Sequence, residues 1–508
     1  MKAPRDYQLA CFDAVRSAYL RGIHGVITTL ATGTGKTVIF VMLAAMTRKK
    51  GGRVLILVNR DVLCDQAAAE LVAYGLHPVI ERGQDNASPM SDLVVASIQT
   101  LSGRRLQKWS RDHFKIVICD ECHGSAAKTF KAVLDHFQSA YHLGVTATPN
   151  RHDKAGLWKG YQEIVYEMPL ASRMDGDKRI VGGIDEGWLC PLEFQELPVP
   201  ITLDDYAATK KSITEAEESA QFEKDGVLQR IFDEGAKALT GLKSLCFFPN
   251  CKASEEAAKA FAGRGLDARH IEGYQSTNDR NRILEWFAKS PDGILCNADL
   301  LSVGYNQPDI QCVGMFRLCK STTTYLQRLG RGTRPSIGVD QYKTAEERRA
   351  AIAASTKPHC KVIDLMIQNE DHNLATPACL ITDDEEELKY LRKENKGKRI
   401  DLSQMEDKLR TKKRTDAEKA LAKLAEDAVN AARRKGFAST PTTGGMHNGV
   451  YIGHILNRGS NGKPASSGAL WYLRKTFGFK PTNPITAQQA YLITEQFKKH
   501  ATKQRQAV

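Results

Sequence analysis

Residues 26–37 read Val-Ile-Thr-Thr-Leu-Ala-Thr-Gly-Thr-Gly-Lys-Thr, a short apolar strand that leads through a glycine-rich turn into the start of a helix. The backbone amides of such a turn can wrap phosphate oxygens, and the helix N-terminus adds partial positive charge. In this arrangement Lys36 reaches the β- and γ-phosphates, and the Thr37 hydroxyl ligates Mg²⁺. The pattern predicts a site for ATP and Mg²⁺ formed by Gly33, Thr34, Gly35, Lys36 and Thr37.

An acidic pair, Asp120-Glu121, follows the apolar stretch 116–119 and supports the nucleotide interpretation. Parallel strands end at one edge of a sheet, so both carboxylates are expected beside the phosphates. We assign Asp120 to the Mg²⁺ shell and Glu121 to the attacking water, with a structural ion pair as the alternative for either. The strict phosphate-loop pattern has glycine where this chain has Leu30. Without the acidic pair, a turn that binds nothing would be the simpler interpretation.

Short apolar segments alternate with helix-length polar segments, which is typical of parallel sheets covered by helices on both faces. The pattern runs through the first third of the chain and restarts after about residue 240. We therefore expect an α/β protein with two similar parallel-sheet domains in tandem. The expected strands are 26–30, 54–58, 93–97, 116–119, 143–146, 244–248, 268–271, 293–296, 312–316 and 361–365.

The chain changes in character beyond the second set of strands. Residues 401–435 hold no Gly or Pro and are rich in Ala, Leu, Glu, Lys and Arg, which predicts one long polar helix ending at Gly436. The expected divisions are a first domain at 1–190, an inter-domain connection at 191–240, a second domain at 241–375, a charged helical linker at 376–436 and a small basic C-terminal module at 437–508.

Two arginines far downstream, Arg331 and Arg334, can complete the nucleotide site from the second domain. They are three residues apart and share one face if this segment is helical. Positive charge at the γ-phosphate stabilises the transition state, by roughly 10³–10⁵ in rate for arginine fingers. Surface arginines on a basic helix are the alternative, which the flanking Gln327 and Gly330 disfavour. The expected catalytic residues are Lys36, Asp120, Glu121, Gln327, Arg331 and Arg334.

The N-terminal residues Arg5, Tyr7 and Gln8 precede the phosphate loop and are candidates for binding the base. A glutamine amide has both a donor and an acceptor, so it can pair with the edge of an adenine. Any surface helix can begin with such residues, which is the alternative.

The charge of the chain favours an anionic partner. The formal net charge is +13 and the sequence pI is about 9.1. From Gly436 to Val508, nine Lys and Arg residues stand against one acidic residue, Glu495. A solvated basic tail is the alternative to a nucleic-acid-binding module.

The twelve cysteines show neither disulfide spacing nor paired Cys-x-x-Cys knuckles. No apolar run approaches the roughly 20 residues that cross a bilayer, and the N-terminus lacks the apolar core of a signal peptide. We expect a soluble chain without a membrane partner in a reducing cytoplasm.

The ordered motifs together resemble those of superfamily 2 helicases and nucleic-acid translocases, over roughly residues 4–366. Residues 31–37 resemble motif I, and Asp120-Glu121-Cys122-His123 resembles motif II in its DECH variant. The other matching segments are residues 5–8 (Q motif), 58–66 (Ia), 97–101 (Ib), 146–149 (III), 247–250 (IV), 273–280 (IVa), 297–306 (V) and 327–334 (VI).

This resemblance implies two RecA-like domains and assigns further roles. It implies that His123, Thr146 and Thr148 couple hydrolysis to movement, and that Gly304 contacts the nucleotide. Asn306 stands where the family usually has Asp, which puts its ribose contact in question. The implied nucleic-acid contacts are Arg60, Gln99, Thr100, Asn250, Gly273 and Ser302.

Aromatic and basic residues are interleaved in the terminal module. We expect Trp471, Arg474 and Lys475 to bind nucleic acid, since aromatic rings stack on exposed bases while cations hold phosphates. The alternative is that the aromatic residues form the core of a small module. Residues 469–481 are similar to a terminal element of phage-type RadD-like helicases.

Within the superfamily, the DECH motif and residues 58–66 most resemble the DNA-directed branch. The resemblance implies an ATP-dependent DNA helicase that translocates on DNA and unwinds or branch-migrates it in recombination, repair or replication. The implied partners are single-stranded, forked or branched DNA, and a single-strand-binding protein or other replication and repair factors; we expect a monomer. A duplex translocase without strand separation, an RNA helicase and a non-catalytic or nuclease-linked DNA-binding subunit are the alternatives.

Overall fold

The computed structural model divides into two compact units, residues 1–406 and residues 407–508. Both parallel sheets lie in the first unit, and the terminal helices lie in the second. The structure describes residues 3–59, 61–122, 128–147, 158–175, 178–202, 214–223, 226–302, 305, 307–367, 374–395, 400–434, 446–447, 450–451, 467–477, 479 and 487–506.

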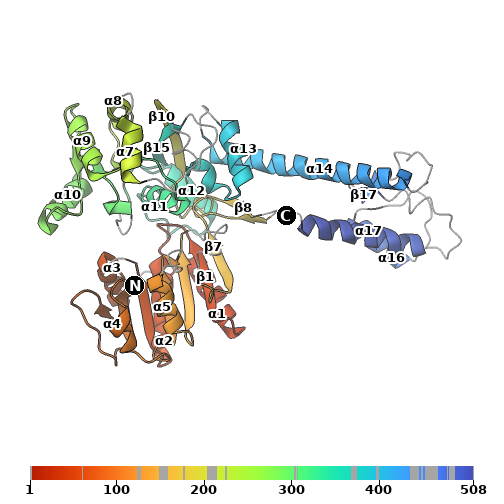
Figure 1. Cartoon of the computed structure of the whole chain (residues 1–508), viewed down its shortest axis with the longest axis horizontal. Coiled ribbons are helices and arrows are strands. Elements are labelled where there is room, and N and C mark those ends of the chain that lie inside the picture. The colour runs from red at the N-terminus through yellow and green to blue at the C-terminus, as the bar shows by residue number, and fades with distance from the viewer. Residues whose placement is uncertain are drawn as a thin grey trace. The chain divides into compact units, whose positions relative to one another are not determined.

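The first α/β domain is built on a parallel sheet that, within the described residues, has seven strands in the order β3-β4-β2-β5-β6-β1-β7 (Figure 1). Strands β1, β2 and β4 are buried along their whole length, as expected for a sheet covered on both faces. The strands are Gly25–Leu30 (β1), Val54–Val58 (β2), Val79–Glu81 (β3), Leu93–Ser97 (β4), Ile116–Asp120 (β5), Tyr141–Thr146 (β6) and Glu163–Met168 (β7).

Alternate residues of this sheet face two different hydrophobic cores. In β2, Val54 and Ile56 pack with helices on one face, whereas Leu55 and Leu57 pack in the core of the other face. This alternation follows from the two-residue period of a strand. The helices are α1 (Asp6–Leu20), α2 (Lys36–Lys49), α3 (Asp61–Ala73), α4 (Gly103–Gln107) and α5 (Lys128–His136).

The second α/β domain repeats the architecture with a parallel sheet in the order β10-β15-β14-β11-β13-β12. The prediction of two parallel-sheet α/β domains is confirmed. The strands are Leu192–Ile201 (β10), Ser244–Phe247 (β11), Ala268–His270 (β12), Ile294–Asn297 (β13), Cys312–Met315 (β14) and Cys360–Ile367 (β15). The helices are α7 (Glu215–Glu223), α8 (Val227–Leu239), α9 (Cys251–Ala262), α10 (Thr277–Lys289), the 3-10 turn η4 (Leu300–Ser302), α11 (Thr322–Leu329) and α12 (Ala345–Ala353).

Strand β10 corrects the predicted connection at 191–240. It pairs in parallel with β15 at the edge of the second sheet, and α8 buries Ile231 and Phe232 in the same core. The segment therefore belongs to the second domain. The sequence pattern did not predict this strand because Pro198 and Pro200 interrupt it. Proline is tolerated in an edge strand, since the side of the strand that has no neighbour needs no backbone N–H donor.

The segment between the two sheets adds an antiparallel hairpin that the sequence did not predict, formed by β8 (Arg173–Asp175) and β9 (Lys178–Ile180). The predicted linker at 376–436 also differs from expectation at its start. There the 3-10 turn η5 (Pro377–Leu380) and helix α13 (Glu385–Asn395) pack on the second domain, where Arg392 donates to the Leu374 carbonyl at 2.9 Å. The predicted long helix is confirmed as α14 (Leu402–Arg434).

The second unit has a small hydrophobic core of its own. Leu473 and Phe479 pack there with Ile493 and Phe497. Its elements after α14 are β16 (Met446–His447), β17 (Val450–Tyr451), α16 (Ser467–Phe477) and α17 (Ala487–Gln506). Within the described ranges of the whole chain, no helix has the length and apolar character needed to cross a membrane.

Candidate active site

The phosphate loop lies between β1 and α2, where the sequence predicts it. Gly33 has a φ of +92° and Gly35 a φ of +75°, left-handed conformations that glycine adopts without strain. Helix α2 begins at Lys36, so the free N–H groups of its first turn face the loop. Leu30, the departure from the strict pattern, is the last residue of β1 and is buried in the core. The core therefore accommodates the leucine without changing the loop.

The lysine of the loop contacts the second carboxylate of the acidic pair. Nζ of Lys36 lies 2.6 Å from Oε1 of Glu121, and these side chains are only 14% and 12% exposed. Burial by itself lowers the pKa of Lys36, but the charges of Glu121 and Asp120 outweigh it and leave that pKa raised. Glu121 thus forms the ion pair that the sequence left open, and its partner is the phosphate-loop lysine itself.

Glu121 has an unusual backbone. Its φ is +52°, a left-handed conformation that costs a non-glycine residue of the order of 1–3 kcal/mol. Asp120 ends β5, and its Oδ1 accepts a hydrogen bond from the Glu121 N–H at 3.1 Å. Strain of this kind is retained where a side chain has to be aimed, and here the Glu121 carboxylate reaches Lys36.

The proposed metal ligands fit Mg²⁺. Thr37 is the second residue of α2 and hydrogen-bonds to Glu70 of α3. Burial raises the pKa of Glu70, and the contact with Thr37 and the charge of Arg334 oppose that rise. Mg²⁺ is usually held by one or two carboxylates together with substrate phosphates. Asp120 and the Thr37 hydroxyl supply donors of that kind, and Glu70 is a nearby carboxylate that the sequence did not reveal.

The arginines of the second domain do not lie on a helix face. Helix α11 ends at Leu329, Gly330 caps it, and Arg331 and Arg334 follow in the turns beyond. The segment is not helical at these residues, so the condition for a shared helix face is not met. Nη1 of Arg331 instead donates to the Tyr305 carbonyl at 2.7 Å.

Electrostatics place Arg331 beside the acidic pair and the lysine. The pKa of Arg331 is lowered to about 10, first by burial and then by the charge of Arg334, while the charge of Glu121 opposes the shift. Arg331 in turn lowers the pKa of Lys36. Groups that shift one another's pKa in this way share one site, although more than 200 residues of sequence lie between Glu121 and Arg331.

Packing joins the same two regions. A Cβ atom placed on Gly330 would lie 2.5 Å from Cβ of Thr32, so a side chain there would require the two segments to shift apart. A Cβ atom on Gly33 would lie 3.4 Å from Cγ of Arg334. The arginine segment, residues 330–334, therefore packs directly against the phosphate loop. The catalytic roles of its arginines stay predictions.

The N-terminal residues support the phosphate loop. Gln8 is buried, and its Nε2 lies 3.1 Å from the Thr34 carbonyl and 3.3 Å from that of Gly35. Its Oε1 accepts from the Arg5 N–H at 2.9 Å, and the Tyr7 hydroxyl donates to Thr34 O. The Gln8 amide therefore supports the phosphate loop in this structure, and its contact with adenine stays a prediction.

Arg5 makes a second kind of contact. Its Nε lies 2.5 Å from Oδ1 of Asp340, and its guanidinium lies 4.8 Å from the ring centre of Trp188. Arg348 covers the same ring at 3.8 Å. The start of α1 is thereby joined to the region that follows the arginine segment.

The other predicted residues lie on different parts of the first unit. Gln327 is buried within α11, and Thr146 is buried at the end of β6. Thr100 accepts from the Gly83 N–H at 3.2 Å, and Gln99 donates to the Asn59 carbonyl.

Asn250 has a structural partner at each end of its amide. Its Oδ1 caps α9 by accepting from the Ala253 N–H at 2.8 Å, and its Nδ2 donates to Ser219 at 2.7 Å. Gly273 follows β12, where its carbonyl accepts from Arg280 at 2.8 Å, and Ser302 ends η4. Arg60, His123, Thr148, Gly304 and Asn306 lie outside the described residues.

The terminal module places its aromatic residues in more than one environment. Phe477 stacks on Phe497 with ring centres 4.9 Å apart, so it supports the core, in line with the alternative interpretation. Arg474 and Lys475 are exposed in the last turn of α16. Trp471 lies within α16, and its side chain is outside the described part of the structure.

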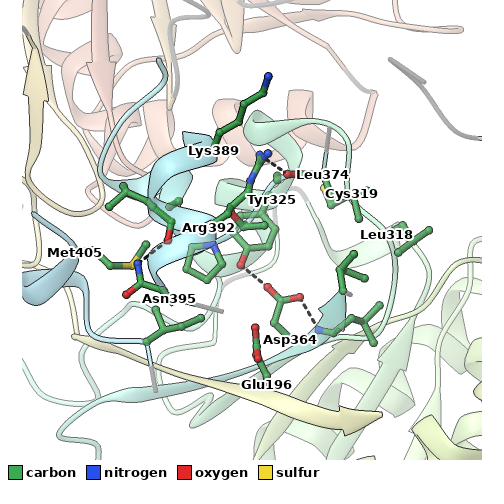
Figure 2. A pocket seen from close by; sticks show the side chains of 18 of the residues that line it. Glu196, Leu318, Cys319, Tyr325, Asp364, Leu374, Lys389, Arg392, Asn395 and Met405 are labelled. Carbon is green, nitrogen blue, oxygen red and sulfur yellow. Dashed lines mark hydrogen bonds between the residues drawn. The ribbon is translucent and has the colours of Figure 1, made fainter. Parts of the chain in front are cut away.

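A cavity of about 240 Å³ lies in the second domain, between α11, α13 and strands β10 and β15 (Figure 2). The Tyr325 hydroxyl of α11 donates to Oδ2 of Asp364 at 2.5 Å, and Glu196 lies near the same carboxylate (Figure 2). Burial raises the pKa of Asp364 to about 6. This contact ties α11, the helix that leads into the arginine segment, to β15.

Comparison with known proteins identifies both domains. Residues 1–151 match the family described as "Type III restriction enzyme, res subunit", and residues 223–336 match "Helicase conserved C-terminal domain". The chain is similar to the ATP-dependent helicase IRC3 of Saccharomyces cerevisiae, with 29% identity over 71% of this chain and 51% of that protein. It is also similar to the mitochondrial ATP-dependent helicase irc3 of Schizosaccharomyces pombe, with 30% identity over 65% of this chain and 55% of that protein. The chain thus spans about half the length of these curated relatives.

A solved structure has the same fold. The ATP-dependent type ISP restriction-modification enzyme LlaBIII bound to DNA superposes with a TM-score of 0.52 at 14% identity, over 98% of this chain and 40% of that chain. The restriction-enzyme subunit match, the helicase C-terminal match and the helicase relatives agree with each other. The paired parallel-sheet domains and the arginine segment packed on the phosphate loop agree with them. By these two domain matches and its helicase relatives, the chain belongs to the superfamily 2, DEAD/DEAH-type helicases.

Proposed function

We propose that this chain is an ATP-driven DNA helicase that translocates on DNA and unwinds or branch-migrates it in recombination, repair or replication. One observation carries the proposal: the arginine segment of the second domain packs against the phosphate loop of the first. A nucleotide bound in that loop would meet groups from both domains, so its hydrolysis would change the contact between them. Coupling of this kind is what converts phosphoryl transfer into movement.

The proposed chemistry assigns one task to each group. Lys36 and the start of α2 bind the β- and γ-phosphates, Glu121 orients the attacking water, and Arg331 with Arg334 stabilises the charge that develops in the transition state. Mg²⁺, held by Asp120 and Thr37, would neutralise phosphate oxygens.

The ion pair between Lys36 and Glu121 gives the nucleotide a way to prepare the site. Phosphates that bind the ammonium of Lys36 would compete with the carboxylate of Glu121, whose Oε1 lies 2.6 Å from Nζ of Lys36. Release of that carboxylate leaves it able to accept a proton from water. ATP binding and the readiness of the base are thereby linked.

The choice of DNA rests on charge and on relatives. The net charge is +13, and the family match to a restriction-enzyme subunit supports a DNA-directed branch. We further propose that residues 437–508 add DNA affinity through their excess of Lys and Arg, including the exposed Arg474 and Lys475.

ATPase rates measured with single-stranded, duplex, forked and four-way DNA, and with RNA of the same sequence, test this function. DNA is expected to stimulate hydrolysis more than RNA, and forked DNA is expected to release its displaced strand. Hydrolysis on duplex without displacement would identify a translocase. Absence of stimulation by every nucleic acid would contradict the proposal.

A further inference from the structure

Lys357 is a buried cation that the proposed chemistry does not use. It lies in the turn between α12 and β15, and its side chain is only 2% exposed. Its Nζ donates to the Arg334 carbonyl at 2.7 Å and to the Pro308 carbonyl at 2.8 Å. An ammonium is costly to bury, so a buried lysine is retained where its contacts matter.

The surroundings of Lys357 do not make it part of a simple ion pair. Burial lowers the pKa of Lys357, and the charge of Arg334 lowers it further. The opposing contributions come from Cys360, Cys190 and Asp309. Asp309 is the carboxylate of that set, and its Oδ2 lies 2.7 Å from Nζ of Lys243. The direct partners of the Lys357 ammonium are therefore the two backbone carbonyls.

One carbonyl belongs to the arginine segment, and the other to the loop that holds the Arg331 side chain. Arg334 is the last residue of the arginine segment, and Pro308 follows Tyr305, whose carbonyl accepts from Nη1 of Arg331 at 2.7 Å. The ammonium thus joins the backbone at Arg334 to the loop that holds the Arg331 side chain.

Neighbouring contacts fix the same stretch of backbone. The Cys190 N–H donates to the Thr333 carbonyl at 2.6 Å, and the Cys190 thiol lies 3.3 Å from the Lys357 carbonyl. A Cβ atom on Gly332 would lie 2.3 Å from Sγ of Cys360. Three consecutive residues, 332–334, are therefore held from outside their own segment.

We propose that Lys357 is a positioning residue for ATP hydrolysis: its ammonium fixes the backbone of the arginine segment at the place from which Arg331 and Arg334 reach the phosphate loop. This inference rests on the proposed ATPase function. The Lys357 ammonium contacts the backbone carbonyls of Arg334 and Pro308, and not the side chains assigned to the phosphates. Its removal should therefore slow the chemical step and leave ATP binding nearly unchanged.

The test is steady-state ATPase kinetics of Lys357→Met in the full chain, in the presence of the most stimulating DNA. The methionine keeps the volume of the side chain and removes both the charge and the donors. We expect kcat to fall by about tenfold to a hundredfold while KM for ATP changes by less than about threefold, because the substitution weakens an interaction made in the transition state.

Lys243→Met is the matched control. Lys243 is also 2% exposed in the same domain, and it donates to Asp309 and to the Ala288 carbonyl, away from the arginine segment. Its removal should lower thermal stability with little change in kcat. An equal fall of kcat in both variants would overturn the proposal, because it would make the Lys357 effect a general effect of burial.

The outcomes separate this inference from the proposed function. Wild-type hydrolysis with a folded Lys357→Met of unchanged kcat overturns the positioning role alone. If Lys357→Met does not fold, the same kinetic split measured on Lys357→Gln decides, and a wild-type kcat there overturns the role. A wild-type chain without ATPase activity on any nucleic acid contradicts the proposed function itself.

Discussion

The two sides of the candidate active site are held in different ways. The phosphate loop is fixed locally, by left-handed glycines at positions 33 and 35 and by a helix that begins at Lys36. The arginine segment lies past the end of α11 and is fixed by residues distant in sequence, among them Tyr305 and Lys357. Changes in the loop should therefore affect ATP binding, whereas changes on the arginine side should affect the rate of hydrolysis alone.

The loop side is broken most completely by Lys36→Ala. Removal of the ammonium should cost at least about 10³-fold in ATPase rate and should also weaken ATP binding, since it takes away a phosphate contact.

Glu121→Gln should reduce the rate by about 10²–10⁴ and still bind ATP, since only the base is removed. Hydrolysis rates and titration with a fluorescent ATP analogue check both. Lys49→Ala, an exposed change at the end of the same helix, is the control, and normal hydrolysis in Lys36→Ala would refute the assignment.

The arginine side is broken by Arg331→Ala. The guanidinium is buried beside Glu121 and Lys36, so its removal should lower kcat by roughly 10³-fold, as for other arginine fingers. The affinity for ATP should change little. The same two assays give the answer, with the exposed Arg264→Ala as a control. A large drop in ATP affinity at an unchanged kcat would reverse the contrast between the two sides.

The packing between the two sides can be loosened without removing a charge. In Gly330→Ala the new methyl group would lie 2.5 Å from Cβ of Thr32, so the arginine segment has to move away from the loop. A displacement of about 1 Å at a catalytic group costs about 10²-fold in rate. Gly338→Ala is the matched control, because a Cβ atom there has no neighbour within 4 Å. Equal kcat in the two variants would show that the packing of these loops does not set the rate.

The second unit offers a contrast with both sides, because its cations Arg474 and Lys475 are exposed. Arg474→Ala combined with Lys475→Ala should weaken DNA binding and reduce the slope of log affinity against log salt by about one for each phosphate that is no longer bound. Basal ATPase activity should stay the same. Fluorescence anisotropy at several salt concentrations measures this, with the exposed Lys252→Ala for comparison. An unchanged salt slope would leave the module with a structural role.

The smallest expected effect concerns the contact between Tyr325 of α11 and Asp364 of β15. Burial raises the pKa of Asp364 to about 6, above the ordinary value of 3.8, so the folded protein holds that proton more tightly than the unfolded chain. The free energy of unfolding should therefore fall as the pH rises from about 4 to about 6, by at most about 3 kcal/mol from this group. Asp364→Asn should remove that part of the fall in urea unfolding curves. If the free energy of unfolding falls equally with pH in Asp364→Asn and in the wild type, a raised pKa of Asp364 is excluded.

The local side of the site could be predicted from sequence. Gly33, Gly35 and Lys36 lie within one turn of chain, and the acidic pair ends a strand whose apolar run is visible. The correctly predicted strands are likewise short apolar runs that are visible in the local sequence. The edge strand β10 was missed because its two prolines look like the end of a strand.

The long-range side could not be predicted, because its signals are tertiary contacts. Nothing near Gln8 in the sequence shows that its amide contacts the carbonyls of Thr34 and Gly35. Glu70 and Lys357 are ordinary residues in sequence, and burial beside an arginine gives each its importance. The end of α11 before Arg331 depends on Gly330 packing against Thr32.

The proposed catalysis depends on residues 330–334 meeting the phosphate loop, and a disulfide between Thr32→Cys and Gly330→Cys measures that proximity most directly. The two Cβ positions are closer than a disulfide requires, so a small relaxation brings them to bonding distance. Mild oxidation of the double variant should yield a linked pair of peptides by mass spectrometry, absent from either single variant, together with an inactive ATPase that reductant restores. A folded double variant that gives no linked peptide would contradict the packing of the arginine segment on the loop.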